Sequence, residues 1–239
     1  MPLASFNGKT IFFAHVPKTG GSSVEDYLIQ RFGPLSIIDT NKRTNTWGTG
    51  LIVPATHLAA IDIAELVPKD LTYSFAVVRD PVTRMMSEYR YQTNVSRMSR
   101  FDFSTWLRIV IAAARVEPRV YENHIRPQAD LVPEDAEVFR LEDGFDAMIA
   151  RLDAVVGDTR PDLAVGHLNP RKKESITLSR QDVALIADYY ATDYARFGYA
   201  LPETAGLPDD AGASRKALLG RTLGWALVRK QRRDWVRTA

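Results

Sequence analysis

The pattern of apolar and polar positions along the chain predicts strands that alternate with helices. Residues 11–14 form a continuous apolar run, as in a strand buried on both faces of a parallel sheet. Residues 73–78 are rich in β-branched and aromatic side chains, and residues 137–141 are expected to form a further strand. Amphipathic segments between and after these strands predict helices over 23–32, 58–66, 81–94, 103–115, 145–156 and 179–190. This alternation favours an α/β fold with a central, mainly parallel sheet flanked by helices.

Local signals set several of these boundaries. Gly33 and Pro34 end the first helix, and Asp80 followed by Pro81 is typical of an N-cap and a first helical residue. Ser179 and Asp182 resemble a capping box in which aspartate replaces glutamate. Two shorter apolar stretches, 35–38 and 51–53, are expected to form short strands.

The charge of the chain is unevenly distributed. The net charge is +2, but the segment from Arg215 onward carries eight basic residues and one acidic residue, a balance of +7, which leaves −5 for the rest. Because the basic charge belongs to this tail, we expect no nucleic-acid partner. Residues 201–214 are rich in Pro, Gly and Asp. We therefore expect a catalytic domain over 1–200, a linker over 201–214 and a basic helical tail over 215–239.

Composition excludes several classes of protein. At 45% hydrophobic and 25% charged residues, the 239-residue chain can bury one substantial core. It has no cysteine, which rules out disulfides, thiolate metal sites and a cysteine nucleophile. The first residues lack the pattern of a signal peptide, and no apolar run approaches the roughly 20 residues of a membrane span. A cytoplasmic location is expected. The tail is expected to dock as a helix on its own domain or on a second subunit, and contact with the anionic inner face of the membrane or with an acidic polymer is the alternative.

The first candidate site follows the strand at residues 11–14. The segment Pro17-Lys18-Thr19-Gly20-Gly21-Ser22-Ser23 leads directly into the first helix. A strand, a glycine-rich loop and a helix direct backbone N–H groups and a helix N-terminus at an anion, and Lys18 adds a positive charge. The nucleoside triphosphate loop has its lysine after the glycines, whereas Lys18 precedes Gly20 and Gly21.

The order of residues in this loop resembles the 5′-phosphosulfate loop of sulfotransferases, which use 3′-phosphoadenosine 5′-phosphosulfate (PAPS). A second segment, residues 75–89, resembles the part of these enzymes that binds the 3′-phosphate. There, an arginine at the end of a strand and a serine in the next helix hold the phosphate, and Arg79 and Ser87 occupy the matching positions. The carboxyl ends of parallel strands are where open α/β sheets bind ligands.

Later segments extend the resemblance to the carbohydrate sulfotransferases that include the 2-O-sulfotransferases and their bacterial relatives. The similar segments are 123–128, 139–142 and 193–199, so that the resemblance covers about residues 9–199. It implies a P-loop-type sulfotransferase fold and transfer of a sulfuryl group from PAPS to a hydroxyl. The implied acceptor is a carbohydrate, as in a glycan or glycolipid. The product of the donor would be 3′,5′-bisphosphoadenosine, and no metal is implied.

The resemblance also assigns roles to residues. Lys18 would neutralise charge on the bridging oxygen as the S–O bond breaks, and the loop from Pro17 to Ser23 would hold the 5′-phosphate. A late basic loop in these enzymes covers the nucleotide, which makes Arg171 and Lys172 candidates for the 3′-phosphate. The expected donor-binding residues are Pro17, Lys18, Thr19, Gly20, Gly21, Ser22, Ser23, Arg79, Ser87, Arg171 and Lys172.

A hydroxyl acceptor requires a base, and a histidine suits this role. His57 occupies the position where the family has a catalytic histidine, and His124 is the alternative. His15 is expected to orient the loop, and His167 to be a loop residue. Two other functions stay open at this point: a P-loop kinase or NTPase, and a non-catalytic protein that binds 3′,5′-bisphosphate nucleotides.

Overall fold

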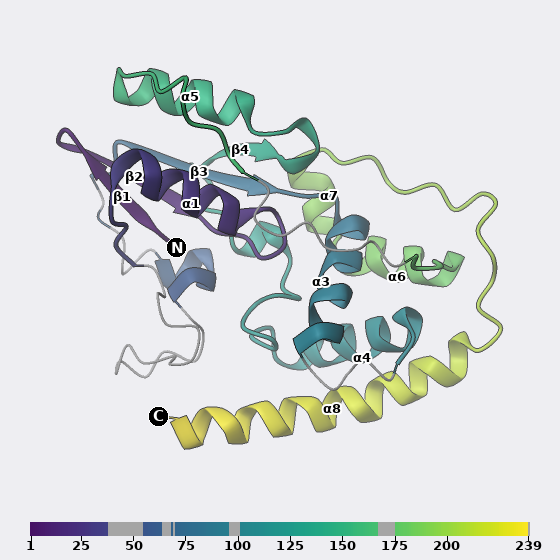
Figure 1. Ribbon diagram of the computed structural model, residues 1–239. Coiled ribbons are helices and arrows are strands. Elements are labelled where there is room, and N and C mark those ends of the chain that lie inside the picture. Colours follow the sequence, from purple (N-terminus) through teal and green to yellow (C-terminus); the bar gives the residue numbers. More distant parts are fainter. Residues whose placement is uncertain (38–54, 64–67, 69, 96–100, 167–174, 239) are drawn as a thin grey trace. The chain divides into compact units, whose positions relative to one another are not determined.

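Figure 1 shows the protein as a computed structural model. The structure describes residues 1–37, 55–63, 68, 70–95, 101–166 and 175–238. It divides into two compact units, each built from two stretches of chain. The first unit comprises Met1–Arg79 and Gln128–Lys172, and the second comprises Asp80–Pro127 and Lys173–Ala239.

The first unit contains a four-stranded sheet in the order β1-β2-β3-β4. β2 (Lys9–Ala14), β3 (Tyr73–Val78) and β4 (Glu137–Arg140) run parallel, with Phe13 beside Phe75 and Val78 beside Arg140. The helices of this unit are α1 (Gly21–Phe32), α2 (Ala60–Ile63) and α5 (Asp146–Val156), together with the short turns η1 (Ala55–His57), η3 (Gln128–Asp130) and η4 (Leu141–Asp143). The expected α/β fold with a mainly parallel sheet is confirmed.

One strand was not predicted. β1 (Leu3–Phe6) pairs antiparallel with β2 through a turn at Asn7 and Gly8, whose φ values are 48° and 74°. An Asn-Gly pair with both residues in the left-handed region is the preferred two-residue hairpin turn, so the sequence held a signal for this strand. Of the strand expected at 35–38, residues 35–37 are described, and they contribute one bridge between Ser36 and Leu3.

The core of the first unit lies between one face of the sheet and two helices. Phe13 and Phe75, both fully buried on adjacent strands, stack with ring centroids 5.0 Å apart. Leu28 of α1 and Leu152 of α5 belong to the same buried cluster, so both helices cover this face (Figure 1). All six residues of β3 are buried, as expected for a central parallel strand.

The second unit is helical in its described residues. It contains α3 (Pro81–Val95), α4 (Phe103–Val116), α6 (Arg180–Tyr189), α7 (Ala191–Phe197) and α8 (Ala213–Thr238). The predicted caps are confirmed: the Asp80 side chain accepts from the Thr83 amide at 2.9 Å, and Ser179 forms a capping box with Asp182. The Asp182 carboxylate, fully buried, also accepts from Ser104 and Arg108 of α4, which ties α6 to α4.

The basic C-terminal segment forms α8, which lies along α4 (Figure 1). Two glycines four residues apart make this close approach possible. A Cβ atom at Gly220 would lie 2.9 Å from backbone atoms of Arg108, and one at Gly224 would lie 2.9 Å from the carbonyl oxygen of Ile109. Arg232 reaches the Glu117 carboxylate at 3.1 Å farther along. The glycines weaken helix propensity, but here they allow backbone-to-backbone packing.

Some expectations fall outside the described residues. This is true of the strand expected at 51–53 and of the last residues of the helix expected at 58–66, of which α2 covers 60–63. The division into a 1–200 domain, a linker and a tail stays a prediction; in the structure α8 begins at Ala213. Among the described residues, no helix combines the length and apolar character that crossing a membrane requires.

Candidate donor-binding site

The loop after β2 is held in a defined shape by a hydrogen bond within it. The buried Thr19 hydroxyl donates to the Val16 carbonyl at 2.9 Å, which closes the loop. Lys18 and Gly20 both have left-handed backbones, with φ values of 71° and 86°. For a lysine this conformation is uncommon and costs energy, and such strain is often found at ligand sites.

The N-terminus of α1 opens directly onto this loop. Gly20 is its N-cap, and no side-chain cap occupies the first turn. The first amide groups of a helix generally point away from it, and the helix dipole places partial positive charge there. In α1 the Ser23 amide donates to the Gly20 carbonyl at 2.9 Å. The loop and the start of α1, residues 17–23, therefore form a cradle suited to a phosphate group.

His15 supports this cradle from beneath. Its Nδ1 lies 2.5 Å from a carboxylate oxygen of Glu25 in α1, and its ring stacks on Phe13 of β2. A Cβ atom at Gly21 would lie 2.2 Å from His15 Nε2, so the imidazole packs directly against the glycine that begins α1. This arrangement fits the orienting role expected of His15.

We expect Gly21→Ala to destabilise the protein by about 1–3 kcal/mol, the usual cost of overpacking, and to weaken nucleotide binding. The new methyl group would displace the His15 ring and with it the loop. Gly166→Ala is the matched control, because a Cβ atom there would meet no atom within 4 Å. Thermal unfolding and nucleotide titration measure both effects. Equal behaviour of the two variants would contradict the supporting role of His15.

Arg79 follows the last residue of β3 and reaches the same cradle. Its guanidinium Nη1 donates to the carbonyl oxygen of Lys18 at 3.3 Å, across 61 positions of sequence. Its backbone is bound by Gln128, whose Oε1 accepts from the Arg79 amide at 3.0 Å and whose Nε2 donates to the Arg79 carbonyl at 2.8 Å. The structure thus brings Arg79 to the loop at residues 17–23, within the first unit.

His57 also lies beside the cradle. It ends η1, and its ring meets the His15 ring edge to face, with centroids 5.2 Å apart. His15 in turn contacts Gly21 at the start of α1. The two histidines therefore lie in contact with each other between η1 and the loop. The preferred candidate for the base is therefore placed next to the candidate donor site.

Ser87 and His124 belong to the second unit. Ser87 lies on α3, two turns after its start at Pro81. His124 is buried; its Nδ1 lies 2.8 Å from the fully buried Glu88 carboxylate, and its ring stacks on Tyr91. Burial, reinforced by the charge of Glu88, raises the pKa of the neighbouring Tyr121 phenol, which therefore stays neutral.

The backbone around His124 is fixed by Arg84, another fully buried residue of α3. Its guanidinium donates to the carbonyl oxygens of His124 and Arg126, both at 3.0 Å. These bonds satisfy carbonyls in a segment where three consecutive residues, 121–123, have left-handed backbones. His124 is thus held firmly, as a structural residue or a base would be.

Some predicted site residues are not described by the structure, and two residues that contact the site were not predicted. Arg171, Lys172 and His167 lie outside the described residues. Gln128 and Glu25 contact site residues and were not predicted to belong to the site. Gln128 is the last residue of the segment 123–128, which resembles a motif of the family, so the sequence contained a reason to include it in the site. No feature of the sequence marked Glu25 as a site residue. Among the described residues, no group of three or more acidic or histidine side chains is arranged to hold a metal ion.

The fold and the loop after β2 together indicate a class of protein. A parallel β2–β3 pair with a glycine-rich loop after β2 and an arginine after β3 is typical of an α/β protein of the P-loop-type fold. A model of the sulfotransferase family matches residues 6–200. The chain belongs to the sulfotransferase family, which confirms the resemblance found in the sequence. Searches of curated proteins and of solved structures gave no match.

Proposed function

We propose that this protein transfers a sulfuryl group from PAPS to a hydroxyl group of a carbohydrate, with a histidine as the base. Membership of the sulfotransferase family supports sulfuryl transfer in general, and the family generally uses PAPS. One observation carries the choice of donor: the Arg79 guanidinium meets the Lys18 carbonyl. Two anion-binding elements at adjacent strand ends match a nucleotide that has phosphate groups on both its 5′ and 3′ oxygens.

The donor contacts divide between these two elements. The backbone of residues 17–23 would hold the 5′-phosphate, with the hydroxyls of Ser22 and Ser23 as further donors. Arg79 would bind the 3′-phosphate as a fixed, always charged group. Ser87, Arg171 and Lys172 complete the proposed contacts with that phosphate.

The proposed step is a single in-line displacement. The acceptor oxygen forms a bond to sulfur while the bond from sulfur to the 5′-phosphate oxygen breaks, and 3′,5′-bisphosphoadenosine leaves. The proton of the acceptor hydroxyl passes to an imidazole nitrogen of His57. Lys18 stabilises the negative charge that develops on the leaving oxygen, so that most of the rate acceleration comes from positioning and electrostatics.

Incubation with sulfur-labelled PAPS and a panel of glycans, glycolipids and small alcohols tests the proposal. Transfer of label to a carbohydrate, without added metal, is the expected result. Tight binding of 3′,5′-bisphosphoadenosine with no transfer to any acceptor would favour the non-catalytic binding protein. Binding and hydrolysis of ATP that depend on Mg²⁺ would favour the kinase or NTPase and overturn the donor assignment.

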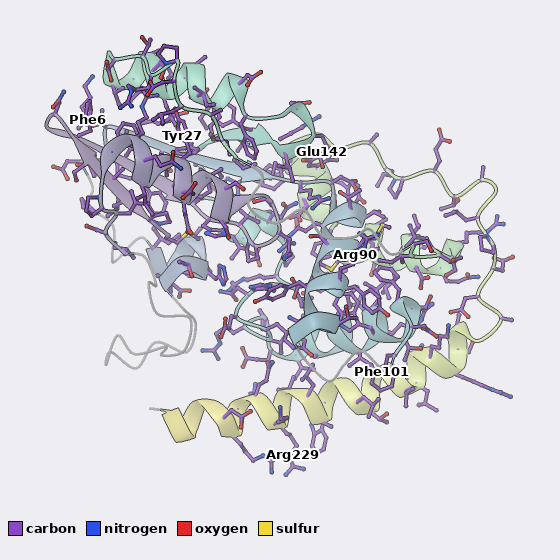
Figure 2. The ribbon with its side chains drawn as sticks, viewed as in Figure 1. Phe6, Tyr27, Arg90, Phe101, Glu142 and Arg229 are labelled. Atoms are coloured by element: carbon purple, nitrogen blue, oxygen red, sulfur yellow. The ribbon has the colours of Figure 1, made fainter. Side chains whose placement is uncertain are left out.

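We also propose a cytoplasmic location in which α8 contacts the anionic inner face of the membrane. One face of α8 packs on α4, and the other exposes Leu218, Trp225 and Arg229. Figure 2 shows Arg229 projecting from α8 on the side away from α4, where its guanidinium lies 4.5 Å from the centroid of the Trp225 ring. Aromatic and basic side chains together favour the interface of anionic lipids.

We expect Arg221→Glu, Arg229→Glu and Arg233→Glu combined to reduce binding to phosphatidylserine vesicles by at least about 10²-fold, since each basic residue near such a surface contributes about 1 kcal/mol. All three residues are exposed, so the fold should be retained. Co-sedimentation of the full chain with anionic and with neutral vesicles measures the effect. Equal binding to both vesicle types by the unmodified protein would contradict membrane contact.

A further inference from the structure

The chain leaves the first unit after Arg79 and returns to it at Gln128. These two points are joined by the side chain of Gln128, which is fully buried. Its amide accepts one hydrogen bond from the Arg79 N–H and donates one to the Arg79 carbonyl, at 3.0 and 2.8 Å. In a sheet, the backbone of a neighbouring strand accepts a hydrogen bond from a residue's N–H and donates one to its carbonyl. Here the amide side chain of Gln128 makes both of these bonds to Arg79.

We infer that Gln128 is a positioning residue that fixes Arg79 and thereby sets selectivity for a nucleotide with a 3′-phosphate. This inference rests on the proposed function, because it takes Arg79 as the group that binds that phosphate. Gln128 itself would touch neither the donor nor the acceptor. It would act through the backbone of Arg79.

The position of Arg79 in the sheet explains why such a device is needed. The pairing of β3 with β2 ends at Ala76, and its pairing with β4 ends at Val78. Arg79 is thus the first residue beyond both ladders, and the sheet no longer determines its backbone direction. A single amide side chain supplies one acceptor and one donor to that residue. Glutamate lacks the donor, and leucine lacks both groups.

Gln128 is well placed to hold this position. It begins η3, and its own carbonyl accepts from the amides of Leu131 and Val132 at 2.9 and 3.1 Å. Its amide is therefore anchored to a short helical turn rather than to a flexible loop. Because the amide is buried, water does not compete for the two bonds. The guanidinium of Arg79 reaches the Lys18 carbonyl from this fixed backbone.

The decisive measurement is a ratio of affinities. Binding of 3′,5′-bisphosphoadenosine and of adenosine 5′-phosphate is titrated for the unmodified protein and for Gln128→Leu. The ratio reports the contribution of the 3′-phosphate alone. We expect Gln128→Leu to lower it about tenfold to a hundredfold, the range that one or two lost buried hydrogen bonds give, with adenosine 5′-phosphate binding little changed.

Gln231→Leu is the matched control. Gln231 of α8 also uses its side chain to bind a backbone amide, that of Tyr121, at 3.2 Å. Its loss should lower the thermal stability and leave the affinity ratio unchanged. A ratio that falls equally in both variants would show that the effect is general destabilisation and would overturn the role of Gln128.

A second variant keeps the test informative if Gln128→Leu does not fold. Gln128→Glu retains the acceptor but sets a carboxylate oxygen against the Arg79 carbonyl. Once protonated, the new carboxyl group can donate to that carbonyl again. We expect the affinity ratio of this variant to recover toward that of the unmodified protein as the pH is lowered. A ratio that does not recover, with the unmodified protein measured at each pH, counts against the inference.

The failure of this inference and the failure of the proposed function are distinguishable. Arg79→Ala should abolish most of the 3′-phosphate contribution if the site is assigned correctly. If Arg79→Ala lowers the ratio and both Gln128 variants leave it intact, the donor site stands and the positioning role is wrong. If Arg79→Ala itself leaves the ratio intact, the assignment of the 3′-phosphate site fails.

Discussion

Lys18→Ala is expected to lower the turnover number on the order of 10²–10³-fold while changing the affinity for 3′,5′-bisphosphoadenosine much less. That range is the usual loss when one preorganised group is removed from developing transition-state charge. The alanine keeps the Cβ atom and the left-handed backbone at this position, where φ is 71°, so the shape of the loop should persist. Arg79→Ala should show the opposite pattern, with the KM for PAPS rising first, because it binds the ground state.

Two further variants, Lys18→Arg and Lys9→Ala, test whether the effect of Lys18→Ala comes from loss of the ammonium group at the loop. Lys18→Arg retains the charge but not the compact ammonium group, and should recover part of the turnover. Lys9→Ala is the control for removal of a lysine from the same unit: Lys9 begins β2, at the opposite end of the strand from the loop, and donates to the Val155 carbonyl. Steady-state kinetics of the three variants test the assignment. A Lys18→Ala enzyme with unaltered turnover would remove Lys18 from the chemical step.

His57→Ala should lower sulfuryl transfer on the order of 10²-fold or more and leave nucleotide affinity nearly intact, which is the signature of a lost general base. The position of His57 beside His15, with ring centroids 5.2 Å apart, sets it next to the donor cradle without making it part of the loop. The rate of transfer and the affinity for 3′,5′-bisphosphoadenosine should therefore respond separately.

The neighbouring histidine provides the contrast. His15→Asn breaks the support between Glu25 and Gly21, so nucleotide affinity should fall before the rate constant for transfer does. His124→Ala tests the alternative base, which the structure holds against Glu88 in the second unit. Unchanged turnover in His57→Ala together with a large loss in His124→Ala would move the catalytic role to His124. Unchanged turnover in both variants would point to a carboxylate.

The sequence by itself determined the elements whose causes are local. The strand, loop and helix around Lys18 follow from an apolar run, two glycines and a helical repeat within 25 residues. The cap at Asp80 and the capping box at Ser179 depend on residues three positions apart, and both occur as predicted. The Asn7-Gly8 hairpin was equally local and could have been found from the same kind of signal.

Only the tertiary structure decided how distant residues share a site. Lys18 and Arg79 are 61 positions apart, and Arg79 and Gln128 are 49 positions apart. Periodicity and capping rules describe neighbours along the chain. The contact between Lys18 and Arg79 exists because parallel pairing sets the carboxyl ends of β2 and β3 side by side. The contact between Arg79 and Gln128 exists because the chain returns to the end of β3 at η3. The same holds for Gly220 and Gly224, which disfavour a helix locally. Their value appears only where α8 meets the backbone of α4.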